Sequence, residues 1–321
     1  MKGRDISIDW LKVMAVLFVF NSHLEHLYGS MGFMATGGMI GVGLFFFCSG
    51  FTLLLKPMEG VRHFPEWYKR RIIRIYPTVF AFAIIDGAFF HNHRDIVTVI
   101  FTGCGWFVQC IMVYYVIIFF IGSYLKNRLK WVAILWPVLV AVCFLHAYHQ
   151  PGFFMFTDPF QRIPFFLFML MGAMTGLSVD KIKIRPVVDA LMLMLCIVAY
   201  YLIIYFSMRN DQPTMLQFFC YFPALGTIYY FYKVFRSKWA ASIYRHPFAQ
   251  SIIRFVGGLC LEIYLIQFSV ITTKLNHLFP LNILIVFAEA LALAYLTRCL
   301  ARFILQTFSD KPYDWTKMVK I

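Results

Sequence analysis

Four ionisable side chains lie at helical spacing near the start of this 321-residue chain, at Asp9, Lys12, His23 and His26. An α-helix turns about 100° per residue, so eleven steps bring His23 to within about 20° of Lys12, three turns further along the same face. Asp9 lies one turn before Lys12 and His26 one turn after His23. An ionisable group inside hydrocarbon is unfavourable unless it faces a partner or a wet cavity, so this polar stripe indicates a site.

His23 is the member of the stripe best suited to chemistry. A neutral imidazole has an ordinary pKa close to working pH and acts readily as a general base. The structural alternative is that Lys12 extends to the membrane interface and pairs with Asp9, while His23 bonds to a neighbouring helix. Because these residues share one face, we favour the catalytic interpretation.

A second constellation is the basic segment from Phe64 to Pro77, which contains Arg70, Arg71 and Arg74. Arg71 and Arg74 are about one helical turn apart, and planar guanidinium groups can bind a phosphate through two hydrogen bonds each. The alternative is a topology signal that also contacts lipid headgroups, and basic clusters at helix ends commonly have this role. Taken alone, this segment favours the alternative.

Three apolar segments carry weaker signals. Around Gly41, Ser49 and Gly50 the small residues permit close helix packing, or leave a groove for a ligand chain, and we favour packing. Trp106 opens a later apolar segment. Glu262 lies in a late apolar run with Tyr264, and it requires a basic partner from another helix.

The elements that must position these residues are membrane helices. The chain is 61% hydrophobic and only 14% charged, and apolar segments long enough to cross a membrane recur along it. We predict an all-α integral membrane protein, one domain over residues 1–321 without a soluble domain. The segment 96–105 is too short to cross. The expected spans, about ten, cover 8–28, 37–57, 75–92, 106–125, 131–149, 163–178, 187–207, 216–235, 252–273 and 281–303.

The basic residues give this layout a direction. With the N-terminus inside, 25 of the 29 lysines and arginines lie at cytoplasmic termini or loops, as the positive-inside rule requires. Both termini are therefore expected in the cytoplasm. The net charge of +14 follows from this bias and any anionic ligand inside, so nucleic acid is not an expected partner. The external exceptions are Arg94, Arg162, Arg209 and Lys274.

The eight cysteines occur singly in or beside apolar segments, without a C-x-x-C pair. This pattern predicts neither a zinc site nor a disulfide framework, and it is typical of core packing. The connections near 56–74 and 236–251 are expected to be amphipathic helices on the membrane surface. The chemistry must then lie inside the bundle or at its two faces.

Taken together, the motifs resemble the membrane-bound acyltransferase family 3, integral-membrane enzymes that O-acylate surface glycans and related acceptors. A basic residue, ten residues and a histidine match Lys12 to His23, a G-V-x-x-F-F-x-x-S-G-F pattern matches Gly41 to Phe51, and R-x-x-R-I-x-P matches Arg71 to Pro77. Trp106 and the late Tyr264-Leu pair match less specifically. The resemblance extends over nearly the whole chain.

The resemblance implies a mechanism. Acyl-CoA, most often acetyl-CoA, would bind from the cytoplasm as a donor substrate rather than a permanent cofactor, with its phosphates near Arg70, Arg71 and Arg74, and Ser49 would contribute to that site. His23 would deprotonate a hydroxyl of a cell-surface or lipid-linked carbohydrate, or carry the acyl group transiently, with Lys12 and Asp9 assisting. Trp106, Glu262 and Tyr264 would contact substrate. A bacterial inner or plasma membrane is the expected location.

The chain also departs from the family pattern. Lys12 stands where many members have arginine, Gly43 where many have aspartate, and Gln267 where many have histidine, while Gln109 lies near the place of a frequent glutamate. These differences indicate a sub-branch with another acceptor. They leave His23 unaffected.

The main rival function is that of a secondary transporter, or a flippase for a sugar or a lipid-linked substrate. Asp9, Lys12, His23 and Glu262 would then form a proton or substrate pathway. No convincing internal repeat of the kind found in many transporters is present. A non-catalytic membrane scaffold is disfavoured by the polar stripe.

Overall fold

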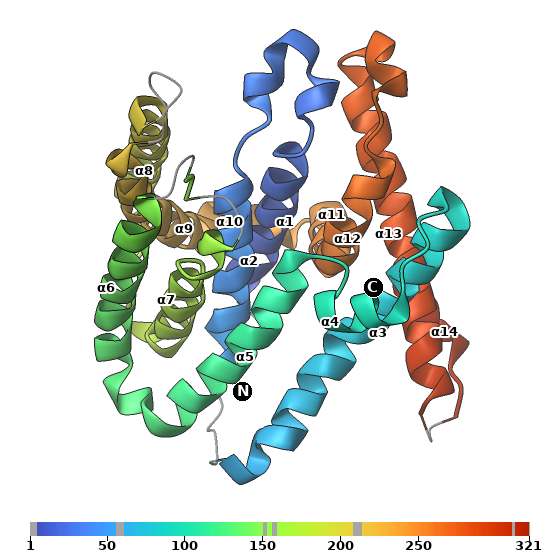
Figure 1. Cartoon of the computed structure of the whole chain (residues 1–321), viewed down its shortest axis with the longest axis horizontal. Coiled ribbons are helices and arrows are strands. Elements are labelled where there is room, and N and C mark those ends of the chain that lie inside the picture. Colours follow the sequence, from blue (N-terminus) through green and yellow to red (C-terminus); the bar gives the residue numbers. More distant parts are fainter. Residues whose placement is uncertain are drawn as a thin grey trace. The chain divides into compact units, whose positions relative to one another are not determined.

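The computed structural model describes residues 5–55, 61–149, 153–155, 159–207, 214–309 and 312–320. Within these residues every regular element is a helix, and no strand is formed (Figure 1). The predicted all-α class is therefore confirmed. The reason is that in hydrocarbon an isolated segment can satisfy its own backbone hydrogen bonds only as a helix.

Two compact units can be distinguished along the chain. Unit 1 comprises Met1–Ala15, Met39–Glu59 and Ile118–Gln250, and unit 2 comprises Val16–Gly38, Gly60–Ile117 and Ser251–Ile321. Three helices continue from one unit into the other, namely α1 (Ile6–Asn21), α5 (Trp106–Tyr124) and α11 (Pro247–Gly258).

Two helices of unit 1 approach each other closely. A Cβ added at Gly50 would collide with the backbone of Met169, and one added at Gly172 would collide with the carbonyl group of Phe47. Glycine is required at these positions because the backbones of α2 and α7 touch there. The packing role expected for Gly50 is thus confirmed. The helices of this unit after α1 are α2 (Gly38–Leu53), α6 (Leu129–Tyr148), α7 (Phe166–Leu177), α8 (Pro186–Ser207), α9 (Tyr221–Phe235) and α10 (Lys238–Arg245).

Unit 2 is built around a 27-residue helix, α3, which runs from Phe64 to Phe90. Pro65 and Glu66 lie in its first turn, where a proline loses no hydrogen bond and an acid favours the helix dipole. The helix ends at His91, which has a positive φ of 57°. The partners of α3 within the unit are α4 (Ile96–Thr102), α12 (Cys260–Val270) and α13 (Leu281–Thr307), and α14 (Trp315–Val319) lies against α13 (Figure 1).

Seven segments are long and apolar enough to cross a membrane, and there are eight if α11 and α12, bent by 69° relative to each other, form one span. The described residues thus support fewer spans than the ten expected, and that number is not confirmed. Two expected spans contain shorter helices, because α1 has 16 residues and α9 has 15. The seven are Gly29–Leu53, Phe64–Phe90, Trp106–Tyr124, Lys126–Tyr148, Phe160–Leu177, Pro186–Ser207 and Leu281–Thr307.

One expected surface helix was wrong. The helix that contains the span placed at 75–92 begins eleven residues earlier, so residues 64–74 are the first turns of α3 and not a separate surface helix, and Pro77 lies inside the helix. Residues 56–60 of that expected surface helix lie outside the described residues. Within the segment 96–105, expected to be too short to cross the membrane, the structure forms the short helix α4, which Asp95 caps by accepting hydrogen bonds from the backbone N–H groups of Val97 and Thr98.

Candidate active site

The first helix ends before it reaches His23. Its last residue is Asn21, whose side-chain amide donates to the carbonyl oxygens of Met34 and Thr36 and accepts from Tyr28. Asparagine competes with the helix for backbone hydrogen bonds, and here its partners hold it at a turn. The expected helix over 8–28 was therefore wrong in its last seven residues.

This early end changes the position of His23. Its backbone N–H donates to the carbonyl of Phe20, three residues back. This spacing is that of a 3₁₀ turn, which is tighter than an α-helix. Because α1 ends at Asn21, the regular helical rotation that would place His23 on the same face as Lys12 does not continue as far as His23. Lys12 lies in unit 1 and His23 in unit 2. His26, in the one-turn helix Glu25–Leu27, is exposed, as expected for a residue nearer the surface.

His23 is half-buried against α12. Its imidazole ring lies 4.5 Å, centroid to centroid, from the ring of Phe268. Phe268 is 60% exposed, so this pair lies at the edge of the unit and not in its core. No sequence signal separates Phe268 from the other 36 phenylalanines in the chain.

A polar network surrounds the end of the unit that carries His23. Asp86 is fully buried near the end of α3, where it accepts hydrogen bonds from Ser269, Asn92 and Arg94. On the neighbouring loops, Asn276 donates to the carbonyl oxygen of His26 at 2.8 Å. Hydrogen bonds thus join α3 to α12 through Ser269, and they join the short helix Thr273–Leu278 to the one that contains His26.

Glu262 has the basic partner that its burial required. Its carboxylate oxygens are 2.8 and 2.9 Å from two guanidinium nitrogens of Arg298 on α13, and Thr78 on α3 donates to it at 3.2 Å. Arg298 also binds the carbonyl oxygen of Gly258, which lies at the bend between α11 and α12. Both oxygens of Glu262 are thus occupied from within the protein, and the network joins α12 to two neighbouring helices. Its predicted contact with substrate stays a prediction.

Two hydrogen-bonded pairs show the direction in which α12 runs relative to α3. Thr78 bonds to Glu262, and about two turns later on both helices Asp86 bonds to Ser269, so α3 and α12 run side by side in the same direction. His23 therefore belongs to the end of unit 2 at which α3 finishes. The rise of 1.5 Å per residue places Asp86 about 22 Å along α3 from Arg71.

The arginines lie toward the opposite end of α3. Arg71 is half-buried, with its guanidinium 4.7 Å from the ring centroid of Trp67 and 5.6 Å from that of Tyr115. Its Nε is buried and has no hydrogen-bond partner within the described part of the chain. Arg70 and Arg74 are exposed and lie close enough to repel it. The aromatic pair was not expected, although Trp67 lies one helical turn before Arg71 in the sequence.

Tyr264 and Trp106 lie near each other through a third aromatic ring. Tyr264 is buried with its ring 5.0 Å from that of Phe107, and Phe107 is 6.3 Å from Trp106. The hydroxyl of Tyr264 also lies beside Gly105, at the start of α5. Unit 2 thus contains His23, the arginines, Trp106, Glu262 and Tyr264.

The other predicted site residues belong to unit 1. Asp9 is buried and accepts a hydrogen bond of 2.8 Å from the hydroxyl of Tyr244 on α10. Lys12 and Ser49 are half-buried. The contribution of Ser49 to a donor site with the arginines stays a prediction.

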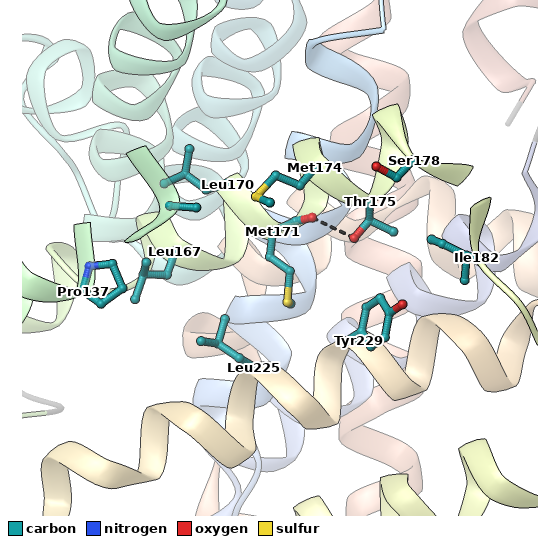
Figure 2. A pocket seen from close by; sticks show the side chains of 11 residues that line it. Pro137, Leu167, Leu170, Met171, Met174, Thr175, Ser178, Ile182, Leu225 and Tyr229 are labelled. Carbon is teal, nitrogen blue, oxygen red and sulfur yellow. Dashed lines mark hydrogen bonds between the residues drawn. The ribbon is translucent and has the colours of Figure 1, made fainter. Parts of the chain in front are cut away.

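Unit 1 also contains an apolar groove of about 380 Å³ between α6, α7 and α9 (Figure 2). Its walls are formed mainly by aliphatic and methionine side chains, with the hydroxyls of Ser178 and Tyr229 at the edge. The hydroxyl of Thr175 donates a hydrogen bond to the carbonyl oxygen of Met171. No predicted site residue lines this groove, and its surface suits hydrocarbon rather than acid–base chemistry.

Within the described residues, no three histidine, cysteine, aspartate or glutamate side chains are grouped as metal ligands. All eight cysteines are free thiols. The chemistry is thus to be sought in the histidine, the arginines and the polar side chains described above.

Comparison with known proteins assigns the family. The model of the acyltransferase domain family Acyl_transf_3 matches residues 5–299, which confirms the resemblance inferred from the motifs. No curated protein and no solved structure gives a significant match. The chain therefore belongs to this acyltransferase family, and its apolar helices make it a multi-pass membrane acyltransferase.

Proposed function

We propose that this acyltransferase moves an acyl group, most often acetyl, from cytoplasmic acyl-CoA to a hydroxyl group of a cell-surface or lipid-linked carbohydrate. The observation that carries the proposal is Arg71. Its buried Nε lacks a partner, and neither it nor Arg70 or Arg74 has an acidic partner among the described residues. A partly buried cation without a partner is unfavourable, so an anion bound beside Arg71 would stabilise it, whereas the exposed Arg70 and Arg74 are hydrated.

The phosphates of acyl-CoA are suitable anions. A guanidinium group binds phosphate through parallel hydrogen bonds, and it also stacks on aromatic faces, as Arg71 does on Trp67. The aromatic rings hold the guanidinium in place, which reduces the entropy lost when the phosphate binds.

The distance along α3 supports donor binding at one end of unit 2 and acyl transfer at the other. The arginines and the His23 end are separated by about 22 Å of helix, comparable with the reach of an extended pantetheine arm. Donor phosphates bound at one end would thus place the thioester toward the other. With the N-terminus inside, the arginine end would face the cytoplasm and the His23 end the outside of a bacterial plasma membrane.

His23 is the proposed general base. It takes the proton from the acceptor hydroxyl, the oxygen attacks the thioester carbonyl carbon, and the carbon–sulfur bond breaks. The proton then passes to the departing sulfur, so the products are an O-acyl ester and free CoA. If His23 carries the acyl group instead, an acyl-imidazole accumulates before acceptor is added, and rapid-quench labelling with radioactive acetyl-CoA distinguishes the two routes.

The transport alternative has one structural argument in its favour. The bend of 69° between α11 and α12 resembles the broken helices that form transporter sites. In this protein, however, Arg298 binds Gly258 and Glu262 across the break, so these groups already have a partner within the protein. Transfer of label from acyl-CoA to carbohydrate in sealed vesicles supports the enzyme, whereas carbohydrate movement without acylation supports transport.

The donor site is tested by binding. Acetyl-CoA affinity of the purified protein should fall about 10- to 100-fold in Arg71→Ala, the range expected for the loss of a hydrogen bond to a charged group. Lys69→Ala is the matched control, because Lys69 is an exposed cation on the same helix about 160° away from Arg71. Equal affinity of wild type and Arg71→Ala would return the cluster to the role of a topology signal.

Sidedness is tested separately by reporter fusions. A reporter fused after Arg128 should be cytoplasmic, and one fused after Arg94 should be external, because only four of 29 basic residues lie outside in the expected layout. An external signal close to Arg71 would remove the arginines from the compartment of acyl-CoA and end the proposal.

A further inference from the structure

The polar side chains of α12 lie on two sides of the helix. At about 100° per residue, Ser269 falls within about 20° of Glu262, whereas Gln267 is turned away from Glu262 by about 140°. Glu262 and Ser269 both have partners on neighbouring helices. This side of α12 is saturated with hydrogen bonds.

Gln267 is the exception. It is 1% exposed, and neither its amide nitrogen nor its amide oxygen has a hydrogen-bond partner among the described residues. A buried polar group without a partner is destabilising, and native proteins contain few of them. An apolar side chain of the same size would avoid this loss. The presence of an amide at this position therefore requires a reason outside the fold.

The neighbours of Gln267 indicate where that reason lies. Tyr264 and Phe268 are within about 100° of it around the helix, on the side away from Glu262. Phe268 contacts the ring of His23, and Tyr264 contacts Phe107 next to Trp106. Gln267 is thus adjacent in sequence to the residue that contacts His23, about 100° from it around α12, and about 60° from Tyr264.

We propose that Gln267 binds the acceptor, with its Nε2 donating to one hydroxyl oxygen and its Oε1 accepting from a second hydroxyl. A carboxamide offers a donor and an acceptor side by side, which matches the paired hydroxyl groups of a sugar ring. Gln267 would then select polyhydroxylated acceptors and hold one hydroxyl for His23. The inference rests on the proposed function, because it assumes that an acceptor is acylated near His23.

The test is Gln267→Met, which keeps the length of the side chain and removes its polar atoms. The acceptor is alkali-deacylated envelope polysaccharide from the source cells, with radioactive acetyl-CoA as donor. Acceptor KM should rise about 10- to 100-fold, the range for an unpaired hydrogen-bonding group in a complex, while donor affinity stays unchanged. The unfolding temperature should not fall, and it should rise by about 2–4 °C if the buried amide is a net loss in the free protein.

Two further variants make the test decisive. Ile263→Met alters a buried neighbour without adding or removing a polar atom, so acceptor KM should remain that of the wild type. Gln267→Asn keeps the amide but withdraws it by one methylene, and its KM should lie between those of wild type and Gln267→Met. This second variant provides the answer if Gln267→Met is recovered only as aggregate.

The outcomes separate the two proposals. If the wild type acylates the polysaccharide and both Gln267 variants keep its KM, Gln267 does not bind the acceptor, while the proposed function stands. A lower unfolding temperature in Gln267→Met with unchanged KM makes the amide a structural group and overturns the inference. If the wild type transfers no acyl group to the polysaccharide, the proposed function and the inference fail together.

Discussion

At the start of α3, three arginines lie together without an acidic partner among the described residues, whereas near its end Asp86 has partners for both carboxylate oxygens. Both groups are expensive to place in a membrane helix. At Asp86 the protein itself supplies the compensation, so the group stabilises the fold. At the arginines no such compensation comes from the described residues, and this difference is the basis for proposing a binding site at Arg71 rather than at Asp86.

The largest expected effect tests whether chemistry takes place at the Asp86 end. His23→Ala should reduce acyl transfer by about 10²- to 10⁴-fold or more, because a general base contributes that much to rate. Donor affinity and unfolding temperature should remain those of the wild type. His26→Ala is the control and should have a smaller effect, since His26 is exposed. Wild-type turnover in a folded His23→Ala protein would show that His23 is not the general base.

The next effect tests the structural role of Asp86. Asp86→Asn removes the charge that binds Arg94, and it should destabilise the protein by about 1–3 kcal/mol, the range for a buried hydrogen bond to a charged group. The measurement is the unfolding temperature in detergent, with acetyl-CoA affinity as the second readout. Glu66→Gln alters an exposed acid in the first turn of the same helix, and it should cost less than about 1 kcal/mol, the range for a charge at a helix N-terminus. A stable variant with weak donor binding would reverse the roles of the two ends.

A smaller effect distinguishes shape from charge at the arginines. Arg71→Lys keeps the positive charge but loses the planar group that lies over Trp67 and Tyr115. Donor affinity should fall about tenfold, consistent with one hydrogen bond. Arg74→Lys should change affinity less, because Arg74 is exposed. Equal effects at both positions would show that only the total charge matters.

The smallest effect concerns pH at the loop that follows Asp86. Hydrogen bonds from Thr98 and Val97 lower the pKa of Asp95 below its ordinary value of 3.8. A carboxyl group with a lowered pKa stabilises the folded state above its unfolded pKa, and this contribution is lost as the pH falls below about 4. Hydrogen exchange in α4 should therefore accelerate in that range. Asp95→Asn, whose side chain still accepts a hydrogen bond without titrating, should show no such acceleration.

The sequence predicted well wherever a strong local signal acts alone. Apolar segments fixed the all-α class, and burial of Glu262 in such a segment required a basic partner, which is Arg298. The motifs around Lys12, Gly41 and Arg71 led to the family that matches residues 5–299. The prediction was wrong where two local signals compete. The apolar run through His23 favours a helix, but Asn21 ends it through bonds to a loop more than ten residues away.

The sequence by itself thus determined that this is a membrane protein, that its fold class is all-α, and that it is an acyltransferase. Hydropathy and charge asymmetry are properties of short segments, and a membrane responds to each segment separately. Only the tertiary structure decided which polar groups are satisfied. Glu262 and Gln267 are five residues apart on one buried helix, yet among the residues that the structure describes the first has partners on two helices and the second has none. Hydrogen bonds between distant segments depend on which faces meet, and no local pattern records that.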